Sequence, residues 1–69
     1  MLLKELEWEE VLIGMKLCSL ADPNVIGTIV KKNYAPEEDR ENSINIEWSN
    51  GNTSARVWHW WQHNEIVED

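Results

Sequence analysis

The sequence predicts a mostly-β fold, in which five short strands form a small barrel behind a short N-terminal helix or irregular arm. Segments rich in β-branched and aromatic residues recur between turn signals about every 8–12 residues, a spacing typical of small sandwiches and barrels. Within 43–48, Ile44, Ile46 and Trp48 alternate with polar residues, as in a strand with one buried face. The Asn50-Gly51 pair that follows is the strongest short signal for a β-hairpin.

The length of the chain fits one domain. Its 69 residues predict a single domain over 1–69, divided into an arm over 1–10 and a barrel over 11–68. A domain of this size buries only ~60% of the surface that its unfolded chain exposes, so the core is thin. The five tryptophans can compensate, because each ring can bury ~150–250 Å².

The N-terminal arm allows two interpretations. Leu2, Leu3 and Leu6 would share one face of a helix, whereas Leu6 and Trp8 would share one face of a strand. In either case we expect Leu3, Leu6 or Trp8 to pack against the barrel.

The first strand is expected over residues 11–18. Its alternation places Ile13, Met15 and Leu17 on one face. Gly14 is expected at a bend or bulge, because an isolated glycine in a strand pattern commonly marks one.

The remaining elements follow from composition and turn chemistry. We expect a turn at 22–24, a strand over 27–32, a polar loop over 33–43, a strand over 53–59, a tight or 3-10 turn over 60–64 and a short strand over 65–68. In the hairpin, Ala55 and Val57 share one face, and we expect Val57 to face the core together with Ile46.

Four segments carry a resemblance to a known family. They are Ile13 to Leu17 with its glycine, Gly27 to Val30, Ile44 to Gly51, and Glu65 to Val67 after a short turn. In this order they resemble SH3-like barrels of the Tudor and KOW kind, a pattern shared by several small bacterial and phage proteins. Members of this group bind peptides, methylated side chains, nucleic acid or neighbouring domains, so the resemblance implies a fold and leaves the function open.

The charge balance bears on the partner. Thirteen acidic residues stand against six basic ones, for a formal charge of −7. Binding to a phosphate backbone needs a basic face, so direct nucleic-acid binding is not expected. A basic protein surface, or a partner without charge, fits better.

Other features bear on location. Cys18 is the only cysteine, so an internal disulfide is excluded. The sequence contains no apolar run of ~20 residues, and the segment after Met1 lacks the basic and apolar regions of a secretory signal. We expect a complete cytoplasmic protein without a membrane segment.

Catalytic and metal sites are not expected. The soft ligands Cys18, His59 and His63 form no motif of four converging donors. No serine stands in a nucleophile motif and there is no glycine-rich phosphate loop, so the sequence predicts neither an enzyme nor a cofactor.

The tryptophan cluster near the C-terminus is the strongest candidate for a binding site. At least one of Trp58, Trp60 and Trp61 should be exposed, since one strand and turn cannot easily hide all three, and exposed tryptophans are enriched at binding hot spots. The alternative is that Trp8, Trp60 and Trp61 close one end of the barrel. The candidate partner-binding residues are Trp58, Trp60, Trp61, Tyr34, Glu37, Glu38 and Asp39.

Three functions remain open at this point. The first is a small acidic module that binds a protein partner, or a second copy of itself, through the tryptophans and an acidic rim. The second is an acidic inhibitor or nucleic-acid mimic that blocks a basic groove. The third is a nucleic-acid binder that uses aromatic stacking with four basic residues, which the net charge disfavours. These residues are Lys16, Lys31, Lys32 and Arg56.

Overall fold

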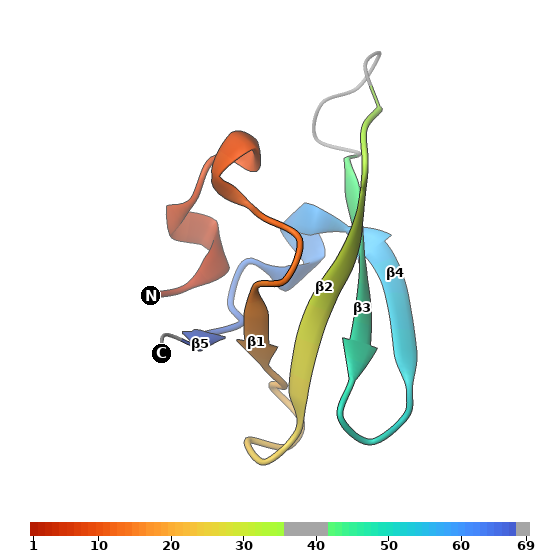
Figure 1. Cartoon of the computed structure of the whole chain (residues 1–69). Coiled ribbons are helices and arrows are strands. Elements are labelled where there is room, and N and C mark those ends of the chain that lie inside the picture. The colour runs from red at the N-terminus through yellow and green to blue at the C-terminus, as the bar shows by residue number, and fades with distance from the viewer. Residues whose placement is uncertain (36–41, 68–69) are drawn as a thin grey trace.

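The computed structural model describes residues 1–35 and 42–67 (Figure 1). In chain order the elements are the 3-10 turns η1 (Leu3–Glu5) and η2 (Trp8–Glu10), the strands β1 (Lys16–Cys18), β2 (Ile26–Asn33), β3 (Ser43–Trp48) and β4 (Thr53–Val57), the 3-10 turn η4 (Trp58–Trp61) and the strand β5 (Ile66–Val67). The prediction of a mostly-β fold with five strands is confirmed.

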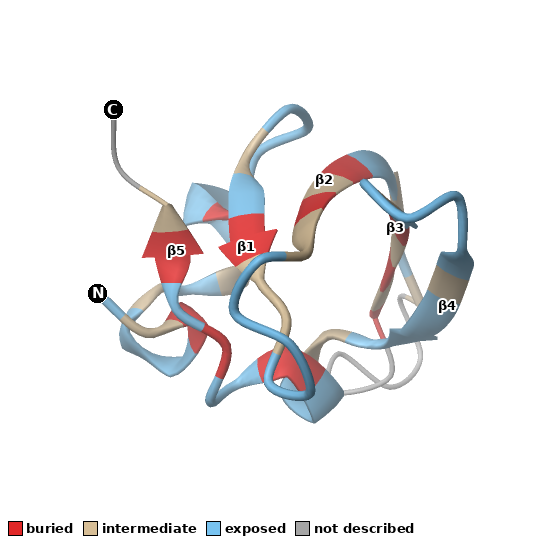
Figure 2. Cartoon of the chain, turned by 90° about the horizontal axis from the view of Figure 1, so that it is seen from below, coloured by how far each residue is buried: buried red, intermediate tan, exposed pale blue. Residues whose placement is uncertain are grey.

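The strands form one antiparallel sheet in the order β4-β3-β2-β1-β5. The first four strands are a meander, and β5 returns to pair with β1. A register shift between Ile29 and Lys31 interrupts the pairing of β2 with β3, and such a bulge bends a strand. Figure 2 shows the result: β2 curves, with β5 and β1 on one side of the molecule and β4 on the other.

The sheet is not a closed barrel, so that part of the prediction is wrong. Within residues 1–35 and 42–67, β4 pairs only with β3. β5 pairs with β1, and the amide of Ile66 donates to the carbonyl of Met1 in the arm at 2.8 Å. The last strand has two residues, and residues 58–65, which include η4, separate it in the chain from β4. An open seam therefore remains between β4 and the other end of the sheet.

The N-terminal helix is also absent, and the irregular arm is what forms. Its two 3-10 turns each have a glutamate at the third position whose side chain accepts a hydrogen bond from the residue before the turn. The amide of Leu2 donates to Glu5 Oε2 at 2.6 Å, and the amide of Glu7 donates to Glu10 Oε1 at 3.0 Å. Each capping pair closes one short turn, and the backbone is extended after η1 at Leu6.

The first strand is shorter than predicted. Residues 12–15 form a turn in which the amide of Met15 donates to the carbonyl of Leu12, and Gly14 has a φ of 98°. This conformation favours glycine. The turn takes Ile13 out of the strand and leaves it 63% exposed, whereas Leu17 is buried, so the prediction that Ile13, Met15 and Leu17 share one face is wrong.

The hairpin of β3 and β4 is confirmed, with a different loop. The amide of Trp48 donates to the carbonyl of Asn52 at 2.8 Å, and that of Gly51 to the carbonyl of Trp48 at 2.9 Å. Gly51 alone supplies the positive φ, at 92°. The connection thus has three residues, 49–51, and not the two-residue form that Asn-Gly favours.

The extra loop residue changes which face of β4 is buried. Ile46 pairs with Ser54, and Ile44 with Arg56, so Ser54 and Arg56 lie on the core face. Val57 lies opposite Ser43 on the outer face and is 39% exposed. The prediction that Val57 faces the core is wrong, because a shift of one residue in register moves every side chain to the other face.

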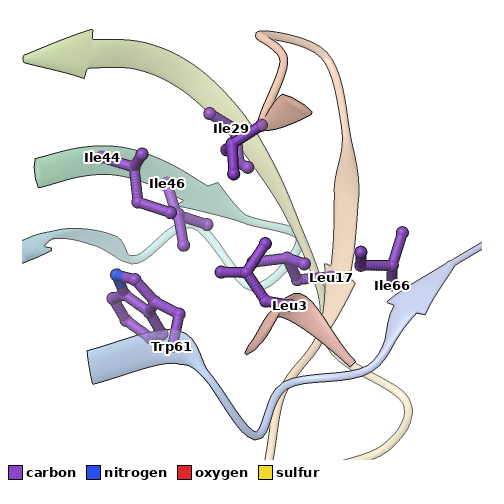
Figure 3. Packing of buried hydrophobic residues seen from close by; sticks show 8 residues of the cluster. Leu3, Leu17, Ile29, Ile44, Ile46, Trp61 and Ile66 are labelled. Carbon is purple, nitrogen blue, oxygen red and sulfur yellow. The ribbon is translucent and has the colours of Figure 1, made fainter. Parts of the chain in front are cut away.

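The core lies inside the curved sheet, under η1 and η4 (Figure 3). The buried apolar residues are Leu3, Val11, Leu17, Ile29, Ile44, Ile46, Trp61 and Ile66. Gly27 permits a close approach, since a Cβ there would stand 2.5 Å from Ile46 Cγ2 and 2.6 Å from the Trp48 ring. The arm contributes Leu3 to the core, with Leu6 and Trp8 packed against it, as expected.

Candidate functional site

Two buried asparagines anchor η4, the turn that carries three of the tryptophans. The carbonyl of Asn42 accepts the amide of Trp58 at 2.8 Å, and its side-chain oxygen accepts the amide of Ala35 at 2.7 Å. At the other end, Asn64 donates from its side chain to the carbonyl of Cys18 at 2.8 Å and from its amide to the carbonyl of Trp61 at 3.0 Å. Both asparagines are buried, so this framework is held away from competing water.

The helical geometry of η4 separates its tryptophans. A 3-10 turn has about three residues per turn, so side chains three positions apart lie on one side. Trp58 and Trp61 accordingly pack against the core, and Trp60 points to solvent with 60% of its surface exposed. The expectation that at least one of the three is exposed is confirmed.

The inward tryptophans form two pairs. Trp58 pairs with Trp8 of η2, with 6.2 Å between ring centroids and planes tilted by 49°. Trp61 pairs with Trp48 of β3 at 5.8 Å and 53°. These tilted geometries are favourable for aromatic pairs. A separate hollow lies beside each pair.

The first hollow, the Trp58 cleft, has a volume of about 330 Å³. Its lining residues are Glu7, Trp8, Glu9, Tyr34, Asn42, Trp58 and His59. Aromatic walls and an acidic edge come together here, because η2 brings Glu7 and Glu9 beside η4.

One of the rings that line the Trp58 cleft already contacts a cation, although Lys32 itself does not line the cleft. Lys32 Nζ lies 4.4 Å from the centroid of the Trp8 ring and donates to the Trp8 carbonyl at 2.9 Å. The His59 ring packs on Trp58 with 4.6 Å between centroids. Because the face of an indole attracts positive charge, and both glutamates are exposed, this region favours a cationic group.

The second hollow, the Trp60 groove, consists of two adjoining parts of about 370 and 270 Å³. Both parts are lined by Ser19, Ala21 and Trp48, which makes them continuous. The other lining residues are Leu20, Trp60, Trp61 and Asn64 in the first part and Asp22, Val25, Asn50, Asn52 and Ser54 in the second. The groove thus runs between the β1–β2 loop and the β3–β4 hairpin.

Exposed apolar side chains mark the first part of the Trp60 groove. Leu20 is 68% exposed and Trp60 is 60% exposed. The guanidinium of Arg56 lies over the Trp60 ring at 4.5 Å from its centroid. On the floor, Trp48 Nε1 donates to Ser54 Oγ at 2.9 Å, so the Trp48 ring is tied to β4.

The candidate residues from the sequence are therefore divided. Tyr34 and Trp58 lie together in the Trp58 cleft, whereas Trp60 lies in the Trp60 groove. Trp61 is 7% exposed and belongs to the core, although its edge reaches the groove. Three further candidates, Glu37, Glu38 and Asp39, lie outside the described residues.

The sequence reasoning missed several residues that line the two hollows. The sequence does not predict the acidic edge at Glu7 and Glu9, because the apolar residues of the arm indicate only packing against the sheet. Leu20 was missed because it stands in a loop without periodicity. The available signal is the alternation of acids with Trp8 in the arm, but tertiary packing places these acids beside Trp58.

The described residues contain no group of three histidines, cysteines or acids placed to hold a metal ion. His59 and His63 are both exposed, and Cys18 is a half-buried free thiol. Across the described part of the chain, no helix combines the length and the apolar character that crossing a bilayer requires.

No protein-family model, curated protein or solved structure matches the chain.

Proposed function

We propose that this protein is a small interaction module that receives a basic side chain of a partner protein in the Trp58 cleft. The observation that carries the proposal is the Trp8–Trp58 pair with Glu7 and Glu9 at its edge. An arginine or lysine there would lie against indole faces and near two carboxylates. Both interactions strengthen as water is displaced.

The charge of the whole molecule supports a basic partner. A formal charge of −7 accelerates encounter with a basic surface and repels acidic ones. The described acids lie on the arm, the β1–β2 loop, β3 and the segment before β5. This scatter favours a module with a local site over a mimic of nucleic acid, which would need a one-sided array of carboxylates.

For the fold, we propose an SH3-like arrangement that stays open along one seam. Its support is the meander of four strands, the short turn before the last strand and the return of that strand to the first. Location in the cytoplasm stays a prediction from the sequence.

A titration with a short arginine peptide, acetyl-Gly-Arg-Gly-Arg-Gly-amide, tests the cleft. We expect the largest amide and indole shifts in ¹H–¹⁵N spectra at Trp8, Tyr34 and Trp58. Tyr34→Ala removes an exposed ring and should weaken binding without loss of the fold. Binding should also weaken as salt is raised, because the charges at the edge of the cleft are exposed.

Charge-reversal variants provide the matched control. Glu9→Lys and Glu47→Lys make the same change in net charge at two exposed positions, but only Glu9 lines the cleft. We expect about a tenfold loss for Glu9→Lys, equivalent to ~1.4 kcal/mol, and little change for Glu47→Lys. Equal losses of peptide affinity in the two variants would mean that binding depends only on the net charge of the protein, and the proposal would fail.

A further inference from the structure

The outer edge of β4 is unpaired. All pairs between β3 and β4 share one register. The amide of Trp48 donates to the carbonyl of Asn52, and that of Trp58 to the carbonyl of Asn42, so these even-numbered pairs are the hydrogen-bonded ones. In an antiparallel ladder, every second residue bonds to the neighbouring strand. The even residues of β4 therefore bond to β3, and the amides and carbonyls of Thr53, Ala55 and Val57 point outward. They have no backbone partner among residues 1–35 and 42–67.

The unpaired edge borders the Trp60 groove. Ser54 and Asn52 line the groove, and Ser54 lies on the core face of β4 opposite Ile46. Next to the end of the strand stands Trp60, with the Arg56 guanidinium over its ring. The part of the groove that Ser54 and Asn52 line is largely polar, and the adjoining part at Leu20 and Trp60 is apolar. The groove and the row of free backbone groups thus lie along the same open seam of the sheet.

We propose that an extended segment of a partner protein adds to β4 as a further strand and lies along this seam. Its backbone would bond to Thr53, Ala55 and Val57. Because strand side chains alternate between faces, every second one would enter the Trp60 groove and the others would face solvent. Main-chain bonds with pockets for alternate side chains are a recurring way to bind peptides.

The chemistry of the groove defines this segment. Leu20, Trp48 and Trp60 call for apolar side chains at the positions that face inward. The formal charge of −7 favours basic residues at the positions that face outward. The partner segment is therefore an extended strand in which apolar and basic residues alternate.

A second copy of this chain fits the seam less well. If two β4 strands paired, Ser54 and Arg56 of the other copy would be the side chains presented to the groove, and both are polar. Pairing would also bring together two molecules that each carry a formal charge of −7, which repel one another. The seam is also separate from the Trp58 cleft, so this inference does not depend on the cleft function.

A synthetic peptide of about eight residues, a common strand length, with alternating valine and lysine tests the proposal. We expect saturable binding below ~1 mM, with shifts at Leu20, Ala55 and the Trp48 and Trp60 indoles. In the free protein the amides of Thr53, Ala55 and Val57 should exchange quickly with solvent, and the peptide should protect them. The proposal would be contradicted if the peptide shifted only residues of the Trp58 cleft. It would also be contradicted if the free protein formed dimers in which the amides of Thr53, Ala55 and Val57 were already protected.

N-methylated peptides separate strand addition from charge attraction. In an antiparallel pairing with β4, which we propose for this segment, the amides of the lysines point toward β4 and those of the valines point away. Methylation of the lysine amides should weaken binding at least tenfold, and methylation of the valine amides should have a much smaller effect. Equal binding of the two methylated peptides would overturn the proposal.

A pair of protein variants tests the groove. Leu20→Glu places an acid in the groove, and Leu12→Glu makes the same change at another exposed leucine outside it. We expect Leu20→Glu to weaken the peptide severalfold relative to Leu12→Glu, because a carboxylate would have to lose water beside the bound valines. A peptide that binds both variants equally well does not use the groove.

Discussion

The Trp58 cleft and the Trp60 groove lie on either side of one short turn, yet they differ in chemistry. The cleft has an acidic edge from Glu7 and Glu9, and the indole of Trp8, which lines it, already contacts the Lys32 ammonium. The groove has exposed Leu20 and Trp60 and a free strand edge beside it. One region is suited to a charge and the other to an extended apolar segment.

The difference shows how a chain of 69 residues can present two surfaces with one set of large rings. Trp58 and Trp61 of η4 each pair with a ring from another element, and these pairs form the walls of the hollows. Trp60 stands between them in sequence and is turned to solvent. The same rings therefore serve the core and the surface.

The adjacent tryptophans of η4 should give the largest contrast in stability. We expect Trp61→Ala to cost ~3–5 kcal/mol of the free energy of unfolding, as for other buried aromatics, and to unfold much of the protein. Trp60→Ala should stay within ~0.5 kcal/mol, as for most surface substitutions. Urea denaturation followed by circular dichroism measures both values. Similar losses would show that both rings belong to one packed cluster, and the separation of the two regions would fail.

Gly27→Ala should damage the groove and spare the cleft. The added methyl group would overlap Ile46 and the Trp48 ring, and overpacking of this kind costs ~1–3 kcal/mol. Indole signals in ¹H–¹⁵N spectra should move for Trp48 and Trp61 more than for Trp8 and Trp58. The control is Thr28→Ala at the next position of β2, where the side chain points to the other face. If the Trp58 signal moves as much as that of Trp48, the two regions are mechanically coupled.

Lys32→Met should have a smaller effect, confined to the cleft. The variant removes the cation over the Trp8 ring and the bond to the Trp8 carbonyl, and we expect a loss of ~0.5–1 kcal/mol. Binding of the arginine peptide should improve, because the lysine no longer competes for the aromatic surface. Lys31→Met, at the exposed neighbouring position, is the control. Weaker peptide binding by Lys32→Met alone would show that Lys32 organises the cleft and does not compete for it.

The smallest effect is expected at a contact outside both regions. The N-terminal ammonium lies 2.7 Å from Glu65 Oε1, and both groups are about half exposed. Exposed pairs of this kind contribute little, so Glu65→Gln should cost no more than ~0.5 kcal/mol and should leave both peptides bound as before. A larger loss, measured by thermal unfolding in low and high salt, would show that the joined termini stabilise the arm and with it the cleft.

Much of the fold follows from local sequence patterns. The alternation of Ile44, Ile46 and Trp48 and the glycine at position 51 were enough to predict the β3–β4 hairpin, because both act through neighbouring residues. The same holds for β2. Local patterns did not predict three other features: the conformation of the N-terminal arm, the turn at Gly14 and the buried face of β4. Each of them changes when a turn is one or two residues longer or shorter.

The length of the β3–β4 loop could not be predicted from the sequence. The Asn50-Gly51 pair is compatible with loops of two or three residues, and the two differ by one step in register. With two residues Val57 would face the core, and with three it faces outward, as observed. The short-range pattern fits both loops, so it does not decide between them.

The sequence by itself determined a small, acidic, mostly-β protein with more aromatic surface than its core can hide, because composition and short-range alternation follow directly from residue identity. Only the tertiary structure decided that Trp8 meets Trp58, that Trp48 meets Trp61 and that the sheet stays open beside β4. These outcomes rest on contacts between residues far apart in the chain. The two candidate binding regions exist only because such contacts bring the arm, the β1–β2 loop and η4 together.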